Sequence, residues 1–268
     1  MDRRRLFVLE KSTLIGIVLG LISVFVGMIL KGAPLSALAS SSAAYLIIIG
    51  GTFACLFNAF PMDQVKKLPT LFKMLFKAPE EQSKGDLVKL FIELSQIARR
   101  EGILALENKV GEIQDPFFRN GLSMVIDGMD PQFVSDVLDA ELAGMEERHA
   151  TGRSILTQAG TYAPTLGVLG AVIGLIAALQ NLDDVNKLGH AISAAFIATI
   201  LGIFTGYVIW LPFANKLKLK SAEEIGVKRM IIEGILSLQA GDSPTAIEAK
   251  LMVFIPQNER ESIKASGE

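Results

Sequence analysis

Charge is missing from four long stretches of this sequence. The chain carries 26 basic and 28 acidic residues, but none of them falls in residues 12–30, 32–62, 154–182 or 188–215. Half of the residues are hydrophobic and the mean hydropathy is +0.43, a composition too apolar for an ordinary soluble domain. The sequence therefore indicates a membrane protein.

Residues that carry enzyme chemistry are also scarce. There is one cysteine, Cys55, which excludes a disulfide framework and a cysteine metal cluster, and the two histidines, His149 and His190, lie far apart in the sequence. Neither a phosphate-binding GxxxxGK loop nor a GxSxG nucleophile motif occurs. We therefore expect no catalytic residue, no metal site, no cofactor and no nucleic-acid partner, and we do not expect an enzyme.

Each charge-free stretch is long enough to cross a bilayer, whose apolar core of roughly 30 Å needs about 20 helical residues. We predict transmembrane helices over residues 14–30, 43–60, 159–179 and 191–213 of the sequence. The first is the shortest, and the basic residues before it are also compatible with a cleaved signal peptide. Its apolar run is longer than that of a typical signal peptide and no clear cleavage site follows, so a spanning helix is the favoured interpretation.

Lysine and arginine fall almost entirely on one side of these four spans. Four precede the first span, twelve lie between the second and the third, and eight follow the fourth; only Lys31 and Lys187 lie in the short connections. Basic segments stay in the cytoplasm. We therefore expect a cell-membrane protein with external loops and three cytoplasmic parts. The loops are residues 31–42 and 180–190, and the cytoplasmic parts are the N-terminus at 1–13, a helical domain at 61–158 and C-terminal helices at 214–268.

The cytoplasmic segments have helical patterns throughout. Residues 65–77 place leucine and phenylalanine on one face and lysines around the other, which suits either the lipid headgroup surface or docking on the helix's own soluble domain. Ser83 predicts the start of a helix that breaks near Gly102. Pro131 predicts the start of a long helix that can continue into the third span, and Pro244 predicts that of a last short helix.

Small residues recur along the spans. Because helices gain little hydrophobic energy from association within lipid, close packing there depends on small side chains. The stripes comprise Gly160, Gly167, Gly170 and Gly174 in the third span, Gly202 and Gly206 in the fourth, and Gly16, Gly20 and Gly27 in the first. Such stripes mark seams between helices, which either close one bundle or meet another chain. Hydroxyls accompany the third and fourth stripes, as if one side met something other than lipid: Thr161, Thr165, Ser193, Thr199 and Thr205.

The predicted spans contain no Asp, Glu, Lys or Arg, and His190 lies only at the outer end of the fourth. An ion path through a membrane normally needs an ionisable group at depth. The chain therefore either conducts no ions or borrows an acid from another chain. Pro164, near the start of the third span, leaves a backbone carbonyl without its helical hydrogen bond, so a neighbour or a cavity must satisfy it.

Two stretches of the sequence, QAGTYAPTLGVLGAVIGLIAAL at residues 158–179 and LGHAISAAFIATILGIFTGYVIWLPFANKL at residues 188–217, closely resemble the MotA family of flagellar motor stator proteins. The resemblance covers nearly the whole chain. It implies an all-α polytopic membrane protein, with four transmembrane helices and a helical cytoplasmic domain inserted between the second and the third. It also implies a ring, a homopentamer embedded in membrane lipid, around two copies of MotB, whose single span carries an ion-binding aspartate.

The resemblance also assigns roles to particular residues. Pro164 and Pro212 match two prolines that the family uses to couple ion flow to movement. Arg99 and Glu107, in the stretch ARREGILALE, match a charged pair that contacts the rotor protein FliG. Taken alone, this pair would be interpreted as part of a solvated helix face.

The resemblance bears on the choice of ion as well. Ala171 stands where sodium-driven members of the family carry a threonine, and Thr199 matches a hydroxyl that is retained nearby. An alanine offers no oxygen ligand to a hard cation, which needs several. The expected ion is therefore the proton.

An ExbB- or TolQ-like energiser of envelope transport is the main alternative, because those relatives share the paired small-residue spans and the ring around a single-span partner. They have three spans and a different arrangement of soluble segments. Four spans and the AGTYAPTLG motif favour the motor. A stand-alone channel is disfavoured, because no span holds an ionisable residue.

Overall fold

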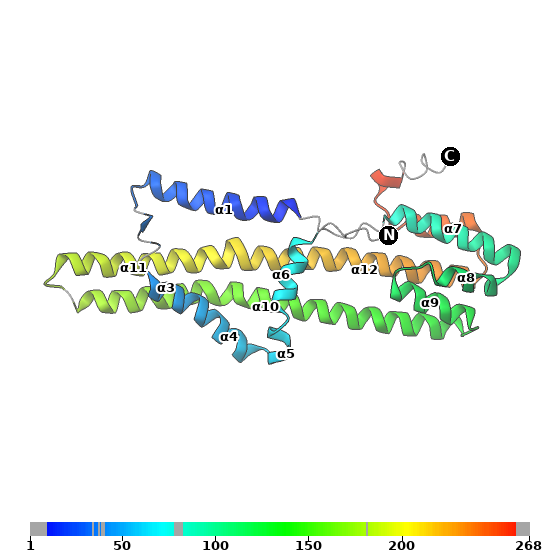
Figure 1. The fold of residues 1–268 in the computed structure, drawn as a ribbon, viewed down its shortest axis with the longest axis horizontal. Coiled ribbons are helices and arrows are strands. Elements are labelled where there is room, and N and C mark those ends of the chain that lie inside the picture. Colours follow the sequence, from blue (N-terminus) through cyan, green and yellow to red (C-terminus); the bar gives the residue numbers. More distant parts are fainter. Residues whose placement is uncertain are drawn as a thin grey trace, which may run out of the picture. The chain divides into compact units, whose positions relative to one another are not determined.

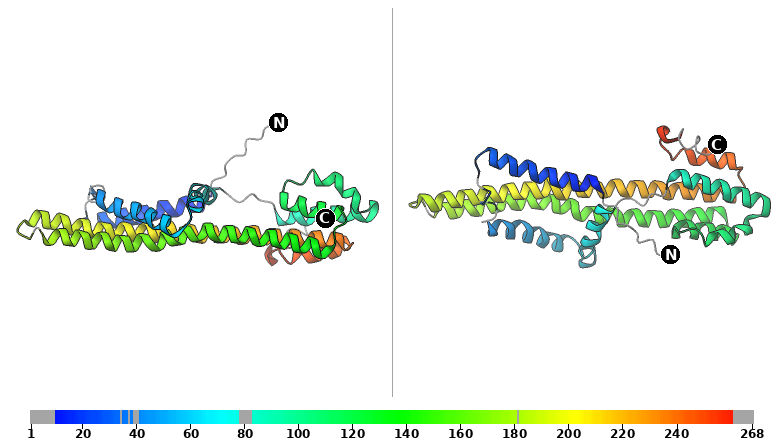
Figure 2. Two further views of the ribbon diagram at one scale, coloured as in Figure 1. Left: turned by 90° about the horizontal axis from the view of Figure 1, so that it is seen from below. Right: turned by 45° about the horizontal axis from the view of Figure 1, so that its top comes forward.

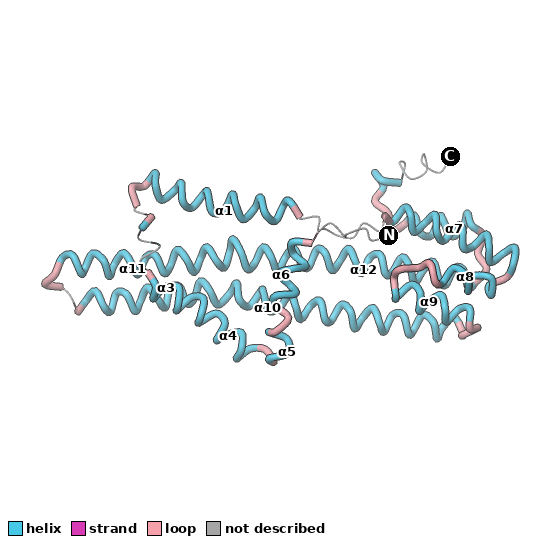
Figure 3. The backbone as a smooth tube through the Cα atoms, in the orientation of Figure 1, coloured by secondary structure: helices cyan, strands magenta, loops and turns pink. Residues whose placement is uncertain are grey.

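The computed structural model describes residues 10–33, 35, 36, 38, 41–77, 83–180 and 182–260. Helices make up nearly all of this part of the chain and no strand runs through it (Figure 3). The predicted all-α class is therefore confirmed. Three of the arginines that led us to expect a cytoplasmic N-terminus lie at residues 3–5, outside the described residues.

The chain divides into two compact units. The first comprises residues 1–78 and 149–219, and the second comprises residues 79–148 and 220–268. The second unit differs from the single segment 61–158 that the sequence suggested as a soluble domain, because residues 61–78 pack with the spans and the C-terminal helices complete the second unit.

Four helical segments of the described chain are long and apolar enough to cross a membrane, as expected from the sequence. The first is α1 (Lys11–Leu30), and the second joins α3 (Ser42–Tyr45), the π-helix η1 (Leu46–Gly50) and α4 (Gly51–Ala59). The third lies within α10 (Pro131–Leu179), and the fourth joins α11 (Val185–Phe204), the π-helix η3 (Thr205–Trp210) and α12 (Leu211–Gln239).

The fourth helix begins at Val185, six residues before the predicted span. Asp184 is its N-cap, and its carboxylate accepts hydrogen bonds from the backbone N–H groups of Asn186 and Lys187, both at 3.1 Å. Such a cap satisfies two of the free donors at a helix start. Helix and hydrophobic span therefore start at different residues.

In the first unit, α10 and α11 pack against each other and the other spans lie outside them. α1 lies on one side of this pair and α3 to α4 on the other (Figures 1 and 2). A buried cluster at one end of the spans joins residues from α4, α10 and α12, with Leu56, Ile155, Leu156, Ala159 and Phe213 at its centre.

The short helices α5 (Met62–Val65) and α6 (Leu68–Phe76) follow the second span. Helix α6 crosses the long helices rather than running along them (Figure 1), and its Leu68 and Leu75 are buried. The ring of Phe72 packs edge-on against Trp210 and Phe213, with centroid separations of 5.7 and 5.9 Å. The apolar face of residues 65–77 therefore docks on the spans and not, as one interpretation had it, on the soluble domain. The headgroup interpretation of the lysine face stays a prediction.

The second unit packs α7 (Lys84–Glu101), η2 (Ile103–Leu106), α8 (Glu107–Val110), α9 (Pro116–Ile126) and α13 (Pro244–Met252) with parts of α10 and α12. Phe91 and Phe118 stack at its centre, 4.8 Å apart. The predicted helix starts at Pro131 and Pro244 are confirmed, as is the break at Gly102, whose φ of +88° suits glycine.

Candidate functional site

Two of the spans, α10 and α11, approach each other closely enough for their backbones to touch. A Cβ placed on Gly202 would lie 2.7 Å from the carbonyl oxygen of Ala163 and 2.8 Å from the Cα of Gly167. A Cβ on Gly167 would lie 2.8 Å from the carbonyl oxygen of Ala198. Two backbones are therefore in contact here, and neither glycine has room for a side chain.

The same seam extends in both directions, with the residue numbers of the two helices running in opposite senses. Gly174 faces Ala195, Gly170 faces Ala198, and Gly160 faces Leu211. All six glycines that the sequence assigned to packing in the third and fourth spans thus lie along one antiparallel contact. Gly170 also lies against Ile47 of η1, so the second span packs on the seam from outside.

Pro164 lies in the middle of this contact, opposite Gly206. A Cβ on Gly206 would lie 2.6 and 2.8 Å from the Cγ and Cδ atoms of the proline ring and 2.9 Å from the carbonyl oxygen of Gly160. Gly160 is four residues before Pro164, so its carbonyl is the one that the proline leaves without a helical donor. The missing side chain of Gly206 therefore makes room for both the ring and the freed carbonyl.

The partner helix is irregular at this level. Thr205 to Trp210 form the π-helix η3, and Pro212 follows it at the second residue of α12. A proline inside a helix removes a hydrogen bond and crowds the preceding turn, and a π turn is wider than an α turn. Pro212 itself is exposed, so it lies outside the seam.

Ala171 and Thr199, the two residues that bear on ion choice, are both half-buried and lie next to the Gly170–Ala198 contact in sequence. The Thr199 hydroxyl donates to the carbonyl of Ala195 at 3.3 Å. The hydroxyls of Thr161, Thr165 and Thr205 likewise donate to carbonyls within their own helices. Each hydroxyl hydrogen is therefore already in a hydrogen bond within its own helix, while the hydroxyl oxygens can still accept hydrogen bonds.

The first span differs from the expectation of a glycine seam. A Cβ on Gly20 would lie 2.6 Å from a methyl group of Val208, but nothing in the described chain lies within 4 Å of such an atom on Gly16 or Gly27. The reason is geometric: only one turn of α1 touches η3, and most of the helix is exposed.

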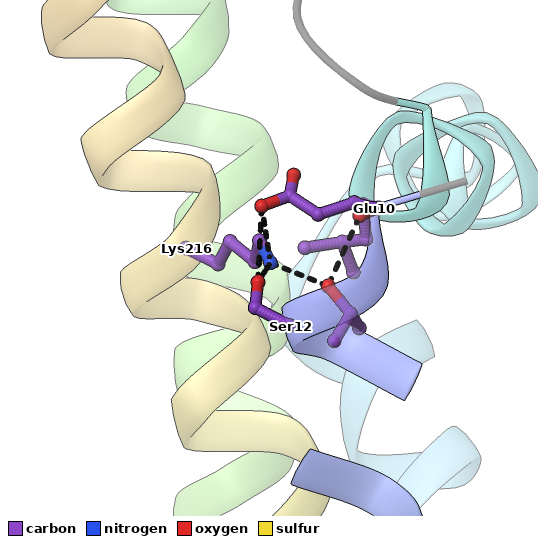
Figure 4. A network of polar contacts seen from close by, with 5 residues as sticks. Glu10, Ser12 and Lys216 are labelled. Atoms are coloured by element: carbon purple, nitrogen blue, oxygen red, sulfur yellow. Dashed lines mark hydrogen bonds and ion pairs between the residues drawn. The ribbon is translucent and has the colours of Figure 1, made fainter. Parts of the chain in front are cut away.

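A polar network that the sequence did not reveal ties the start of α1 to α12 (Figure 4). The Lys216 ammonium lies 2.8 Å from the Glu10 carboxylate and donates to the hydroxyls of Ser12 and Thr13 at 2.7 and 2.5 Å. Thr13 in turn donates to the Leu75 carbonyl of α6 at 3.4 Å. The partners lie some two hundred residues apart in the sequence, so no local pattern signals the contact.

The predicted rotor-contact residues lie in the second unit and do not form a pair with each other. Arg99 is in the last turn of α7 and Glu107 begins α8, on either side of the turn at Gly102. Both side chains are exposed, and within the described chain neither makes an ion pair. Two opposite charges are thus presented to solvent on adjoining elements.

A shallow cavity of about 240 Å³ adjoins Arg99 and is also lined by Ser95, Gln239 and Asp242. A hydrogen bond from Lys250 lowers the pKa of Asp242 below its ordinary value, and the same bond, with help from Glu233, raises the pKa of Lys250. The Lys250 ammonium lies 2.9 Å from Asp242 and 3.2 Å from Glu233. This cluster closes the turn between α12 and α13.

None of the seam residues is titratable, and the described residues hold no cluster of His, Cys, Asp or Glu that would bind a metal. What the seam offers is shape: two helices in backbone contact, a proline facing a glycine, and a π-helical turn beside it. Such an arrangement can shape a surface against which another chain packs. It cannot bind a proton by itself, because it has no titratable group.

Comparison with known proteins identifies the family to which a chain with this arrangement is similar. Residues 109–230 match the MotA/TolQ/ExbB proton channel family, and residues 14–102 match the Motility protein A N-terminal family. Motility protein A of Bacillus subtilis is 52% identical over 97% of this chain and 96% of its own length.

Solved structures agree with these matches. A chain in the flagellar MotAB stator complex from Bacillus subtilis superposes with a TM-score of 0.90 at 53% identity, covering 94% of this chain and 99% of that one. A chain of C. jejuni MotAB superposes with a TM-score of 0.86 at 32% identity, covering 92% and 96%. The chain therefore belongs to the MotA family and is a stator subunit of the flagellar motor in the inner membrane.

Proposed function

We propose that this chain assembles with a MotB partner into a proton channel whose ion flow drives the rotor. The observation that carries the proposal is the combination of a tight, proline-containing seam with four charge-free spans. Because no span holds a titratable acid, a carboxylate from a second chain must bind the passing ion. The solved relatives are MotAB complexes, which supports MotB as the source of that acid.

The ion path in this proposal runs beside the third and fourth spans. Pro164 and Pro212 couple ion passage to movement of the helices, and Ala171 and Thr199 line the path. Ala171 supplies no oxygen ligand, so a sodium ion would lack one of the several oxygens that it needs at this point of the path. Proton transfer to a borrowed carboxylate requires no such cage.

The proposed assembly is a ring of five copies with both chain ends in the cytoplasm. The glycine seam closes each copy, and the exposed apolar faces of the spans meet neighbours, the partner and lipid. Nearly all lysines and arginines fall before the first span, between the second and third, or after the fourth, which supports the cytoplasmic placement of these segments.

The second unit would then contact the rotor protein FliG through Arg99 and Glu107. Both side chains are exposed and have no ion-pair partner within the described chain, so their charges are available to another protein. Complementary charges across an interface favour the correct partner, and like charges placed opposite each other cost several kcal/mol.

Charge reversal tests this contact. Glu107→Lys should strongly reduce swimming speed while the protein is still inserted and assembled, and reversal of the facing charge on the rotor should restore it. Glu223→Lys, an equal charge change at an exposed position of α12, serves as the control and should leave swimming nearly unchanged. Normal motility of the Glu107 variant would place the rotor contact elsewhere.

A further inference from the structure

Helix α6 lies at the level where the spans leave their apolar stretches. Its backbone carbonyls at Leu75 and Phe76 accept hydrogen bonds from Thr13 and Glu10, at the start of α1. Its aromatic face meets Trp210 and Phe213, at the end of the charge-free stretch 188–215.

Helix α10 also contacts α6 close to an end of its charge-free stretch. The side chain of Leu71 fills the space beside Gly152 of α10, just before the charge-free stretch that begins at residue 154. Helices α1, α10 and α12 therefore all contact α6 close to an end of a charge-free stretch, where the sequence predicts one edge of the bilayer.

The face of α6 that points away from the spans is basic. Lys73 and Lys77, at the end of α6, are four residues apart and so lie on one side of the helix, Lys66 lies in the turn between α5 and α6, and all three are exposed. No acidic residue occurs between residues 64 and 77. Within the described chain, Lys66 and Lys73 have no carboxylate partner, whereas Lys77 has other contacts.

Apolar side chains flank this basic face. Met62 is 55% exposed and Met74 is 39% exposed, and both belong to the segment that leads into or forms α6. A helix that presents lysines and apolar side chains at the bilayer edge matches the chemistry of the headgroup region, where cations meet phosphate and methylenes meet acyl chains.

We propose that α6 is an anionic-phospholipid binding element, with Lys66 and Lys73 contacting the headgroup phosphates of the adjacent leaflet. The aromatic face of α6 docks on the spans and holds the helix in place. The lysines therefore stay at a fixed depth relative to the bilayer, unlike those of an undocked amphipathic helix. This inference rests on membrane insertion of the spans and is independent of ion conduction and of the rotor contact.

The single tryptophan of the chain reports on this site. Trp210 packs against Phe72 of α6, so lipids that gather beside α6 are close to it. The full chain is reconstituted in phosphatidylcholine with increasing amounts of phosphatidylglycerol carrying brominated acyl chains, which quench nearby tryptophan. The ratio of quenching by brominated phosphatidylglycerol to that by brominated phosphatidylcholine gives the lipid preference around α6.

The double variant Lys66→Gln, Lys73→Gln should lose the preference for phosphatidylglycerol. A lysine near an anionic surface contributes about a fivefold gain in binding, so two lysines account for a loss of up to about 30-fold. The control removes two exposed cations of the second unit, Lys89→Gln with Arg229→Gln, and should keep the preference. Both variants should unfold at the wild-type temperature, because all four side chains are exposed.

Three outcomes would overturn the proposal. The first is a wild-type chain without a preference for phosphatidylglycerol. The second is an equal loss of the preference in both double variants, which would indicate a diffuse charge effect. The third is loss of the preference in inorganic phosphate but not in chloride at equal ionic strength, which would indicate a site for free anions. Loss of the preference in the α6 variant alone, unaffected by phosphate, supports a lipid site.

Discussion

Gly202 and Gly206 show how single residues set the geometry of the spans. At Gly202 the backbones of α10 and α11 are in contact, and at Gly206 the absent side chain leaves space for the ring of Pro164. In lipid, such small residues replace the hydrophobic effect as the reason why helices associate closely. One added methyl group at these positions therefore changes the distance between two helices.

The seam predicts a clear difference between glycines. Gly202→Ala should destabilise the protein by about 1–3 kcal/mol, the usual cost of overpacking a tight core, because its Cβ meets backbone atoms that cannot rotate away. Gly27→Ala, at a position with nothing within 4 Å in the described chain, should have little effect. Thermal unfolding in detergent, followed by Trp210 fluorescence, measures both. Equal shifts for the two variants would contradict the seam.

At the residue scale the second unit also has a pH-dependent contact. The hydrogen bond from Lys250 lowers the pKa of Asp242 from its ordinary 3.8. A carboxyl whose folded pKa is depressed stabilises the fold above its unfolded pKa, and this contribution disappears as the pH falls through the folded value. Lys250, whose pKa is raised from 10.5, contributes below that value and loses its contribution at higher pH.

Asp242→Asn should therefore lower the unfolding temperature between pH 6 and 8, and this difference from wild type should shrink as the pH falls below about 3.8. Thermal scans across pH measure it. In a Lys250→Met background, the same substitution should have a smaller acid-dependent effect, because the largest cause of the lowered pKa of Asp242 is gone. An acid-dependent difference of undiminished size in that background would assign the effect to another group.

At the scale of elements, α9 depends on one side chain with two tasks. Asp115 is the N-cap of α9, where it accepts a hydrogen bond from the Phe117 N–H at 3.0 Å. It also pairs with Lys228 of α12 at 2.5 Å, and the two side chains are only 9% and 11% exposed. Lys228 further lies 5.2 Å from the ring centre of Phe117. The ion pair thus joins two helices inside the core.

Asp115→Ala should cost about 3–5 kcal/mol, because it leaves the Lys228 charge buried without a partner and removes the cap as well. Asp115→Asn keeps an oxygen for the cap and should cost less. Asp127→Ala, at the exposed C-terminal end of the same helix, is the control and should stay within about 0.5 kcal/mol of wild type. Urea unfolding gives the three values. An alanine variant as stable as the control would show that the pair contributes little.

The residues at which helices begin and end were the features of the elements that could be predicted best from the sequence. Pro131, Pro244 and Gly102 act through their own backbone restrictions, so their effect is local and each lies where predicted. Ser83 is less informative: it precedes α7 as expected, but its side chain makes no capping hydrogen bond. The π-helices at residues 46–50 and 205–210 were not predicted, because their wider turns depend on packing against neighbouring helices.

At the scale of the whole molecule, four spans without an acid lead to a prediction about transport. Vesicles containing this chain alone should show little proton flux, whereas vesicles containing the chain with its MotB partner should conduct, because only the pair has a carboxylate at depth. The flux should not depend on external sodium. A pH-sensitive dye inside the vesicles measures it. Proton leak through the chain alone, as fast as through the pair, would overturn the proposed mechanism.

The sequence by itself determined the helical class, the four spans and the glycine stripes. These follow from local properties: apolar run length, charge placement and the backbone preferences of proline and glycine. The resemblance in residues 158–179 and 188–217 added the family, which the comparisons confirm. The roles of Arg99, Glu107, Ala171 and Thr199 stay predictions, since exposure and burial do not show what a side chain contacts in an assembly.

Only the tertiary structure decided which partners these residues meet. Residues 65–77 fit two environments equally well as a sequence, and the aromatic contacts of Phe72 placed them against the spans. Glu10 and Lys216 are distant in sequence and pair only because α1 packs beside the end of the fourth span. Likewise, a glycine stripe predicts close packing but not its partner. The physical reason is that contact energies depend on distance in space, which a one-dimensional pattern does not contain.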